Sequence, residues 1–479
     1  MACNFEDSGL RLGKLRLNKH SIFGDVEVNL SHESSSSNYR TIILGPNGTG
    51  KSSFLGGIAD ILSIEFSKDK NKSLKSYKED YDLEIVIDSE KYNIRPDFEK
   101  VELDIEKVIA VTSTMQDRFP FIAKNSVRRS DKYIYLGMKT ASNNIFFSNL
   151  KENILLSLFP IYYDAKRTKT AINVLSKLGF GDNFKFQINK GRNYSKVLKA
   201  LINNEAISYN DNYDAKNLKE FIDSKYAKEN RLKISNLFDE INEKDKGYLI
   251  NVKLEDRNRF NDKVSYLELI KKLLSNNVIS IGDLSLFSTS GYDMNQASSG
   301  EFNVLRTFLS VIANVSDNTV VLIDEPEVSL HPNWQMEFIS ILDLALSHYK
   351  GCHSIIATHS HFILSNISNE DSSIISLLPS SESRNVYVSD LNLELYGWSP
   401  ENVLYRAFGV TGYRNKYFEI DLRIIIDFLS ESKADHTEFI EAVCRVEPFK
   451  LEVNDPLYKI IENARNKRDK ILLGLSNNG

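Results

Sequence analysis

Cysteine is scarce in this 479-residue chain, which contains only Cys3, Cys352 and Cys444. Their spacing matches neither a disulfide framework nor a set of metal ligands. Few, scattered cysteines are typical of proteins in a reducing compartment. Residues 1–10 lack the apolar segment of a secretory signal peptide. No uninterrupted apolar run reaches the roughly 18 residues that a membrane span needs. We therefore expect a cytoplasmic protein with no membrane partner.

The chain also lacks a strong excess of charge, since 65 acidic and 60 basic residues leave a net charge of −5. This balance implies no global attraction to nucleic acid. Two local basic clusters keep DNA open as a partner, although surface solvation explains such clusters more often. They are Lys124, Arg128, Arg129 and Lys132 in the first cluster, and Arg465, Lys467, Arg468 and Lys470 in the second.

No internal repeat and no sustained heptad pattern are visible. The apolar pattern instead predicts two groups of short strands, with helices between them and further helices after the second group. Strands are expected over 10–17, 22–30, 41–44, 83–87, 92–94, 108–112, 319–324, 354–358, 374–377 and 386–388. Helices are expected over 216–238, 266–274, 400–408, 422–429 and 438–443.

The most informative stretch follows the apolar run 41–44 and fits the pattern G-x-x-x-x-G-K-S. It predicts a loop whose backbone N–H groups cradle phosphates, with a lysine for the outer phosphates and a serine hydroxyl for Mg²⁺. A plain glycine-rich turn does not explain the Lys-Ser pair. The candidate nucleotide-binding residues are Gly45, Pro46, Asn47, Gly48, Thr49, Gly50, Lys51, Ser52 and Ser53.

A second motif places two carboxylates at the end of the apolar strand 319–324. Sheets of α/β proteins bind ligands at the carboxyl ends of their strands. Asp324 is therefore a candidate Mg²⁺ ligand, and Glu325 a candidate general base that activates water. A strand that merely ends in a polar turn is the plain alternative, which the earlier phosphate loop makes unlikely.

Two shorter motifs complete the candidate site. Ser298, Ser299, Gly300 and Glu301 precede a predicted helix, and small residues before a helix can form an anion-binding terminus. An ordinary N-cap is the alternative reading. His359 follows the strand 354–358, where it could contact a terminal phosphate and sense its loss.

These four motifs resemble the ATP-binding-cassette type of ATPase, in the soluble branch with SMC-like and OLD-like proteins. The resemblance implies an α/β fold with a mixed sheet, ATP and Mg²⁺ as cofactors, and a head-to-tail dimer with two sandwiched nucleotides. It also implies that Ser298 to Glu301 close over the nucleotide of the partner subunit. The match departs from the family at Ala297, which replaces a leucine, and at Glu301, which replaces the commoner glutamine.

The family resemblance leaves two contacts less well defined. A glutamine after the strand that follows the phosphate-loop helix contributes to the metal site in this family, and Gln116 is the candidate here, with Asp117 as an alternative. Adenine contacts are expected from the N-terminal strands near His20, Ile22 or Phe23.

A narrower resemblance comes from the string 325–332, which looks like the OLD-type Glu-Pro-Glu-x-x-Leu-His-Pro signature, and from 358–364. The strings 131–137, 398–404 and 408–415 are similar to the ATPase subunit of Septu anti-phage systems, also found with some retrons. OLD relatives carry a nuclease domain that needs an Asp-x-Asp cluster, and none follows Ala357. The resemblance therefore implies a separate HNH nuclease subunit.

We expect an N-terminal ATPase lobe over 1–147, a mostly helical insertion over 148–290, a C-terminal ATPase lobe over 291–394 and a helical region over 395–479. The expected function is ATP-dependent regulation of a defence nuclease. One alternative is an SMC-like DNA-repair ATPase that acts directly on DNA, although a long helical arm with heptads is missing. A scaffold with a dead nucleotide site is the other, against which the intact motifs speak.

Overall fold

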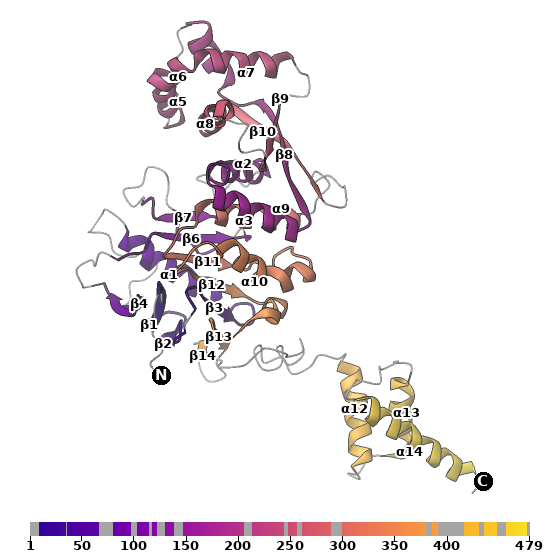
Figure 1. Cartoon of the computed structure of the whole chain (residues 1–479). Helices are drawn as coiled ribbons and strands as arrows, with labels where there is room; N and C mark the ends of the chain where they lie inside the picture. The colour runs from indigo at the N-terminus through magenta and orange to yellow at the C-terminus, as the bar shows by residue number, and fades with distance from the viewer. Residues whose placement is uncertain are drawn as a thin grey trace. The chain divides into compact units, whose positions relative to one another are not determined.

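The computed structural model divides by its contacts into two compact units, Met1–Val403 and Leu404–Gly479 (Figure 1). The residues it describes are 9–34, 36–66, 80–96, 103–114, 117–121, 130–137, 147–205, 213–243, 248–255, 261–288, 299–368, 370–379, 386–390, 416–430, 435–447 and 457–476. Within these ranges, no helix is both long and apolar enough to cross a membrane.

The first unit is built on a seven-stranded mixed sheet. All neighbouring strands are parallel except the outermost pair, β13 and β14. The order across the sheet is β14 (Val386–Asp390), β13 (Ser372–Pro379), β3 (Tyr39–Leu44), β12 (His353–Thr358), β11 (Thr319–Asp324), β6 (Lys107–Thr112) and β7 (Tyr133–Leu136). The mixed-sheet α/β fold expected from the sequence is confirmed.

The central strands β3, β12 and β11 are buried at every position. Parallel strands covered on both faces carry continuous apolar runs, which is why the sequence pattern revealed them. The structure confirms strands at all ten predicted segments. The strand β7 was not among them.

A second, four-stranded antiparallel sheet lies beside the first. In β4, buried and partly buried residues alternate throughout, because one face of the sheet packs on the core. The order is β2 (Gly24–Asn29), β1 (Arg11–His20), β4 (Tyr81–Ile87) and β5 (Glu90–Ile94).

His353 joins this sheet to the other, since its Nδ1 accepts the Leu12 N–H at 2.9 Å. Burial lowers the pKa of His353 to about 3, so the ring stays neutral.

Helix α1 (Lys51–Glu65) fills the space between the two sheets. Its apolar side chains share one core with the antiparallel sheet and with every second residue of β11, Val320 and Leu322. The alternate residue Ile323 faces the other side, where it meets α9 (Ser299–Asn314) and α10 (Pro332–Leu346). Because successive strand residues point to opposite faces, α1 covers one face of the sheet, and α9 and α10 cover the other.

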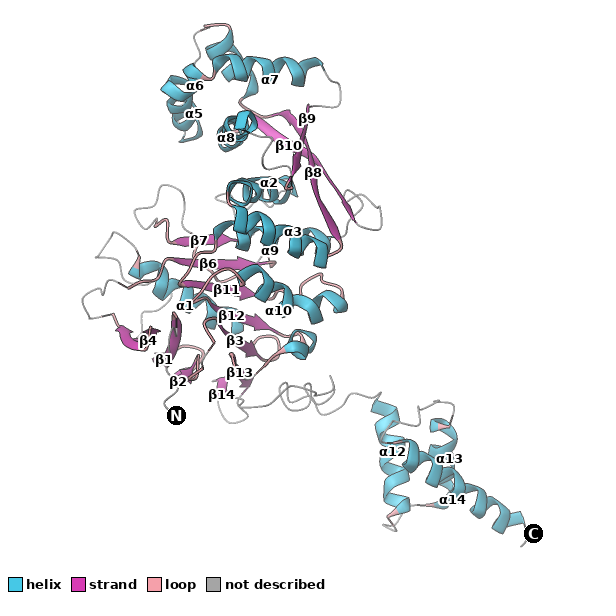
Figure 2. Ribbon diagram, in the orientation of Figure 1, coloured by secondary structure: helices cyan, strands magenta, loops and turns pink. Residues whose placement is uncertain are grey.

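Residues between β7 and α9 form an insertion of helices and a three-stranded antiparallel sheet in the order β10, β8, β9 (Figure 2). Its elements are α2 (Phe147–Tyr163), α3 (Ala165–Lys177), β8 (Phe180–Lys190), α4 (Tyr194–Val197), the π-helix η1 (Leu198–Ile202), α5 (Tyr213–Asp223), α6 (Lys225–Glu229), α7 (Arg231–Glu243), β9 (Tyr248–Lys253), α8 (Asn261–Ser275) and β10 (Ile279–Ser288). These three strands were not predicted from the sequence, because charged residues at helical spacing obscure the two-residue period of Phe184, Phe186 and Ile188, which are buried in β8.

The insertion contacts the main sheet through helix α9. Ser157 on α2 lies 3.1 Å from Ser310 on α9, Oγ to Oγ. Arg167 on α3 donates to the carbonyl oxygens of Ala313 and Val315, at the end of α9. These contacts attach the base of the insertion to α9.

The second unit contains α12 (Lys416–Leu429), α13 (His436–Val446) and α14 (Tyr458–Ser476), which share their own apolar core. The helices predicted over 422–429 and 438–443 lie inside α12 and α13. The helix predicted over 400–408 lies outside the described residues. The domain boundaries set from the sequence stay predictions.

Candidate functional site

The phosphate-binding loop connects β3 to α1, as the sequence predicts. A Cβ at Gly45, where φ is +154°, would lie 2.4 Å from the Leu377 carbonyl oxygen, so only glycine fits this turn. Gly50 is the N-cap of α1 and no side chain caps it. The first N–H groups of α1 are therefore oriented to receive an anion. Asn47 and Gly48 are exposed at the tip of the loop, and Ser53 is half-buried in the first helical turn.

Lys51 lies within this loop and is only 4% exposed. Its Nζ donates to the carbonyl oxygens of Gly45 at 2.7 Å and of Pro46 at 3.0 Å. Burial lowers the pKa of Lys51, while the carboxylates of Glu325, Glu327 and Asp324 oppose that shift. The ammonium group thus faces the acidic end of β11 across the loop.

Ser52 and Asp324 bring the two main motifs together, although 272 positions separate them in the chain. The Ser52 hydroxyl donates to Asp324 Oδ1 at 3.0 Å. Burial raises the pKa of Asp324 to about 7; the Ser52 hydrogen bond opposes this, and the nearby carboxylates of Glu325, Asp117 and Glu327 add to it. A hydroxyl and a buried carboxylate with acidic neighbours are hard oxygen ligands that suit Mg²⁺.

Glu325 follows Asp324 in a left-handed backbone conformation with φ of 48°. Non-glycine residues adopt this conformation at a cost, and it persists where the surroundings impose it, often at active sites. Here the Glu325 N–H donates to the Ala357 carbonyl oxygen at 2.9 Å, which ties the turn to the end of β12. The side chain is half-buried at the carboxyl edge of the sheet.

His359 directly follows β12, as predicted, and contacts a residue that the sequence analysis did not assign to the site. Glu327 Oε1 accepts from the His359 backbone N–H at 2.6 Å and lies 3.0 Å from its Nδ1. Glu327 is the second glutamate of the Glu-Pro-Glu string, so its role could have been predicted from the sequence. Only Asp324 and Glu325, at the strand end, were assigned roles there.

Helix α9 begins at Ser299, so the predicted small-residue segment does open a helix. Ser298 lies outside the described residues, as does the side chain of Ser299, and Glu301 is half-buried in the first turn. Gly300 packs against the loop after β11, where a Cβ would lie 1.8 Å from the Ser329 carbonyl oxygen. The tip of α9 is therefore held against the loop that carries Glu325 and Glu327 in the same subunit.

Two polar residues of α9 that the sequence analysis did not identify face the sheet. Arg306 is 1% exposed and donates to the carbonyl oxygens of Leu136 at 2.7 Å and Thr112 at 2.9 Å. Burial lowers the pKa of Arg306 to about 10. A single arginine in the apolar run 304–309 was the available signal. Its two hydrogen bonds fix α9 to the ends of β6 and β7.

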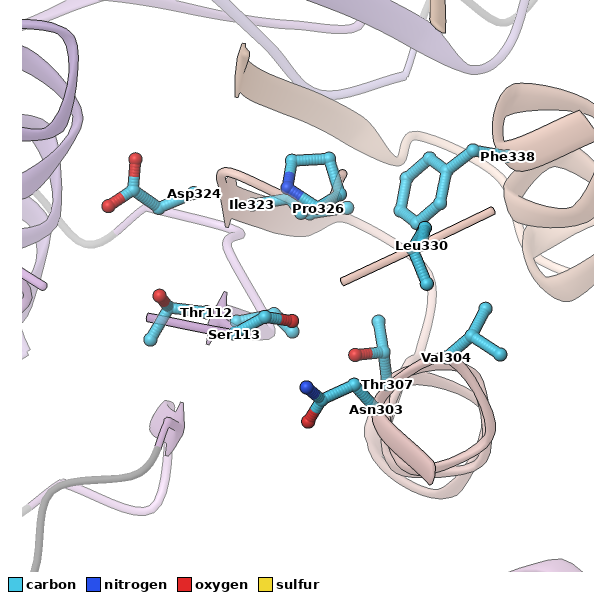
Figure 3. Close-up of a pocket in the computed structure, with 11 residues that line it drawn as sticks. Thr112, Ser113, Asn303, Val304, Thr307, Ile323, Asp324, Pro326, Leu330 and Phe338 are labelled. Carbon is cyan, nitrogen blue, oxygen red and sulfur yellow. The ribbon is translucent and has the colours of Figure 1, made fainter. Parts of the chain in front are cut away.

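Asn303 lines a small cavity between α9 and the ends of β6 and β11, as Figure 3 shows. Its Oδ1 is buried and has no hydrogen-bond partner among the described residues. Thr307 and Ser113 add polar groups, and Leu330 and Phe338 close the other side. In Figure 3 the Asp324 carboxylate turns away from Asn303, consistent with its hydrogen bond to Ser52.

Gln116, the predicted third metal ligand, lies outside the described residues. Its alternative, Asp117, is 5% exposed and accepts from Tyr135 Oη at 2.8 Å and from the Phe119 N–H at 3.0 Å. Both carboxylate oxygens of Asp117 thus have protein donors. This arrangement favours a structural role for Asp117.

The turn between β1 and β2, where adenine contacts are expected, lies against the phosphate loop. A Cβ at Gly50 would lie 3.1 Å from Phe23 Cζ and 3.2 Å from Ile22 Cγ2. Phe23 is buried between His20 and Phe54. Ile22 is half-buried beside the loop, so of these residues it has the side chain best placed to meet a base.

The second basic cluster lies on α14 in the C-terminal unit. Arg468 pairs with Glu447 and Asp469, and Arg465 donates to the Glu447 carbonyl oxygen. The charge of Arg468 is thus matched within its own unit, which weakens the case for DNA binding there. In the first cluster, Lys124, Arg128 and Arg129 lie outside the described residues.

A phosphate loop, a strand-end Asp-Glu pair and His359 meet at the carboxyl edge of one mainly parallel sheet. These features are typical of P-loop ATPases. The family described as "AAA domain, putative AbiEii toxin, Type IV TA system" matches residues 40–365, more than half of the chain. The chain belongs to this family.

The "Retron Vc95 probable ATPase" of Vibrio cholerae serotype O1 biovar El Tor is 24% identical over 400 residues, which cover 76% of this chain and 74% of that protein. The SMC head domain from Thermotoga maritima is 11% identical with a TM-score of 0.31, covering 80% of this chain and all (100%) of that one. The ABC transporter component cbiO1 from Clostridium perfringens is 13% identical with a TM-score of 0.29, covering 89% and 100%. At TM-scores this low, the structural likenesses carry no argument.

Replacing Gly300 with alanine should lower the melting temperature, because the new Cβ meets the Ser329 backbone and a shift is unavoidable. Overpacking of this kind costs about 1–3 kcal/mol. Gly282→Ala is the control, since the nearest atom there is the flexible side-chain end of Asn189. Thermal unfolding followed by circular dichroism measures both variants. Equal melting temperatures for Gly300→Ala and the unmodified protein would contradict the packing of α9 described above.

Proposed function

We propose that this chain binds and hydrolyses ATP with Mg²⁺, and that it is the regulatory subunit of a bacterial anti-phage defence complex. The observation that carries the ATPase proposal is the 3.0 Å contact between Ser52 and Asp324, which joins the phosphate loop to the carboxyl end of β11. A hydroxyl and a carboxylate meeting beside a buried lysine form the donor set that a metal-bound triphosphate requires.

Each residue of this site has a role in the proposal. Lys51 neutralises the outer phosphates, and the N–H groups of the loop bind their oxygens. Ser52 and Asp324 hold Mg²⁺, with Gln116 as the further ligand, and the ion neutralises phosphate charge. Glu325 accepts a proton from the attacking water.

The nucleotide is sandwiched between two copies of the chain in the proposed assembly. The tip of α9, with Ser298, Ser299, Gly300 and Glu301, closes over the ATP held by the phosphate loop of the other copy. The start of α9 at Ser299 supports this role, because helix N-termini attract phosphate. ATP then shifts the equilibrium between the open and closed assemblies, to the extent that it binds one state more tightly than the other.

The defence role rests on the likeness to a retron ATPase and on the Septu-like strings. A separate HNH nuclease subunit is the proposed partner, regulated by the nucleotide state of this chain. The contacts of α2 and α3 with α9 give one route by which closure of the nucleotide site would reach the insertion. The insertion and the C-terminal unit are proposed as the partner's contact surfaces.

The proposal expects an HNH nuclease to be encoded beside this chain, and co-expression of the two proteins tests whether they interact. We expect one complex by size-exclusion chromatography with light scattering, and a nuclease activity on phage DNA that changes with ATP. The chain alone, assayed for DNA binding over a salt series, is the control, because direct phosphate contacts give a steep salt dependence. No complex, together with tight salt-dependent DNA binding by this chain alone, would favour the DNA-repair alternative instead.

A further inference from the structure

Glu327 holds both the backbone and the ring of His359. Its Oε1 accepts the His359 N–H at 2.6 Å and lies 3.0 Å from Nδ1. The two residues belong to different loops, which follow the neighbouring parallel strands β11 and β12. The histidine side chain is 41% exposed, whereas the glutamate side chain is 4% exposed. A buried carboxylate thus orients a ring whose other edge is accessible.

Stability alone does not account for a glutamate at this position. Its second oxygen, Oε2, is buried and has no hydrogen-bond partner within the described ranges. Burying a half-satisfied carboxylate costs free energy, and a residue of similar volume without charge is often no less stable. In folded proteins, buried charged groups with incomplete hydrogen bonding concentrate at functional sites. The charge of Glu327 therefore points to a role in the chemistry of the site.

Contacts on both sides of His359 fix its backbone, so only the torsions of its side chain remain to be set. The Glu325 N–H is bonded to Ala357, just before the end of β12. On the other side of His359, the Ser360 hydroxyl donates to Gln335 Oε1 on α10 at 2.5 Å. The backbone around His359 is therefore fixed from two directions. The Nδ1 contact with Glu327 is what sets the remaining side-chain torsions.

We propose that Glu327 is a positioning residue for ATP hydrolysis, which fixes His359 with Nδ1–H toward Glu327 and Nε2 toward the terminal phosphate. The inference rests on the proposed function. Phosphate oxygens accept hydrogen bonds, so Nε2 must carry a proton to bind them, and the ring is then a cation. The Glu327 carboxylate offsets that positive charge. Nδ1 thus contacts Glu327, and Nε2 contacts the terminal phosphate.

The first experiment measures the tautomer and needs no ATP turnover. In protein labelled with ring-¹⁵N histidine, the His359 signals are assigned by their loss in His359→Gln. We expect Nδ1 to carry the proton in the unmodified protein and Nε2 to carry it in Glu327→Ala, because the acceptor for Nδ1–H is gone. The same tautomer in both proteins would overturn the proposal, whether or not the chain hydrolyses ATP.

The second experiment is a double-mutant cycle on steady-state kinetics. We expect Glu327→Gln and Glu327→Ala to lower kcat about 10- to 100-fold, by analogy with the loss seen when the outer partner of a metal-ligating histidine is removed. KM should stay unchanged, since Lys51 and the loop still bind the phosphates. Glu337→Gln on α10 is the control, because this glutamate is exposed and pairs with Lys177.

The double-mutant cycle distinguishes a positioning role of Glu327 from a loss of kcat that comes only from a change in protein structure. In a His359→Ala background, Glu327→Gln should have no further effect on kcat, because the group that Glu327 acts through is absent. An equal loss in both backgrounds would overturn the proposal. Glu327→Gln keeps the side-chain volume, so it remains informative if Glu327→Ala does not fold. Failure of ATP hydrolysis in the unmodified protein would instead remove the proposed function and leave the tautomer result standing.

Discussion

Replacing Glu325 with glutamine should lower the rate of ATP hydrolysis about 100- to 10,000-fold, the range that a general base contributes. The amide has nearly the same shape as the carboxylate but cannot accept the proton of the attacking water. ATP binding should survive, because Lys51, Ser52 and Asp324 are unchanged. The protein should then accumulate as a closed dimer with ATP. Phosphate release measures turnover, and light scattering with and without ATP measures the dimer.

The matched control for this variant is Glu229→Gln, an exposed glutamate at the end of α6 that pairs with Lys225. Its turnover should equal that of the unmodified chain. Two results would contradict the assignment of Glu325. Hydrolysis at the unmodified rate in Glu325→Gln would exclude it as the base. Loss of ATP binding in that variant would mean that the residue serves the phosphate site instead.

Replacing Lys51 with alanine should weaken ATP binding about 10- to 100-fold. Hydrogen bonds to charged groups contribute about 1.5–3 kcal/mol, and about 1.4 kcal/mol corresponds to a factor of ten. Burial disfavours the charged form of Lys51, and an arriving triphosphate relieves that cost by pairing with the ammonium group. Fluorescence titration with a labelled ATP analogue measures the affinity. Turnover and ATP-dependent dimerisation should fall together with it.

Lys225→Ala is the control for this variant, because its side chain is 89% exposed on α6, outside the phosphate loop. It removes the same charge from the chain without touching the site. Unchanged affinity in Lys51→Ala, with the fold verified by circular dichroism, would exclude the loop as the phosphate site. Equal losses in both variants would point to a general effect of net charge.

The phosphate loop was predictable because its chemistry is local. The eight residues of the G-x-x-x-x-G-K-S pattern would bind phosphate through their own backbone N–H groups and two adjacent side chains, so one contiguous segment carries the whole signal. The strands β3, β11 and β12 were equally predictable, since a strand that is buried on both faces needs apolar residues along its whole length. The strand β8 was missed because its period-two pattern sits among helices and charged residues, where helical spacing fits nearly as well.

The sequence by itself determined the central strands β3, β11 and β12, the lysine and serine of the loop, and the acidic pair that ends β11, because each depends on neighbours in the chain. Only the tertiary structure decided the pairing of Glu327 with His359, 32 positions apart, and of Arg306 with Thr112, 194 positions apart. These contacts exist because β11 lies between β12 and β6, and α9 packs across their ends. Which side chains meet at a sheet edge depends on strand order, and strand order is a property of the whole fold.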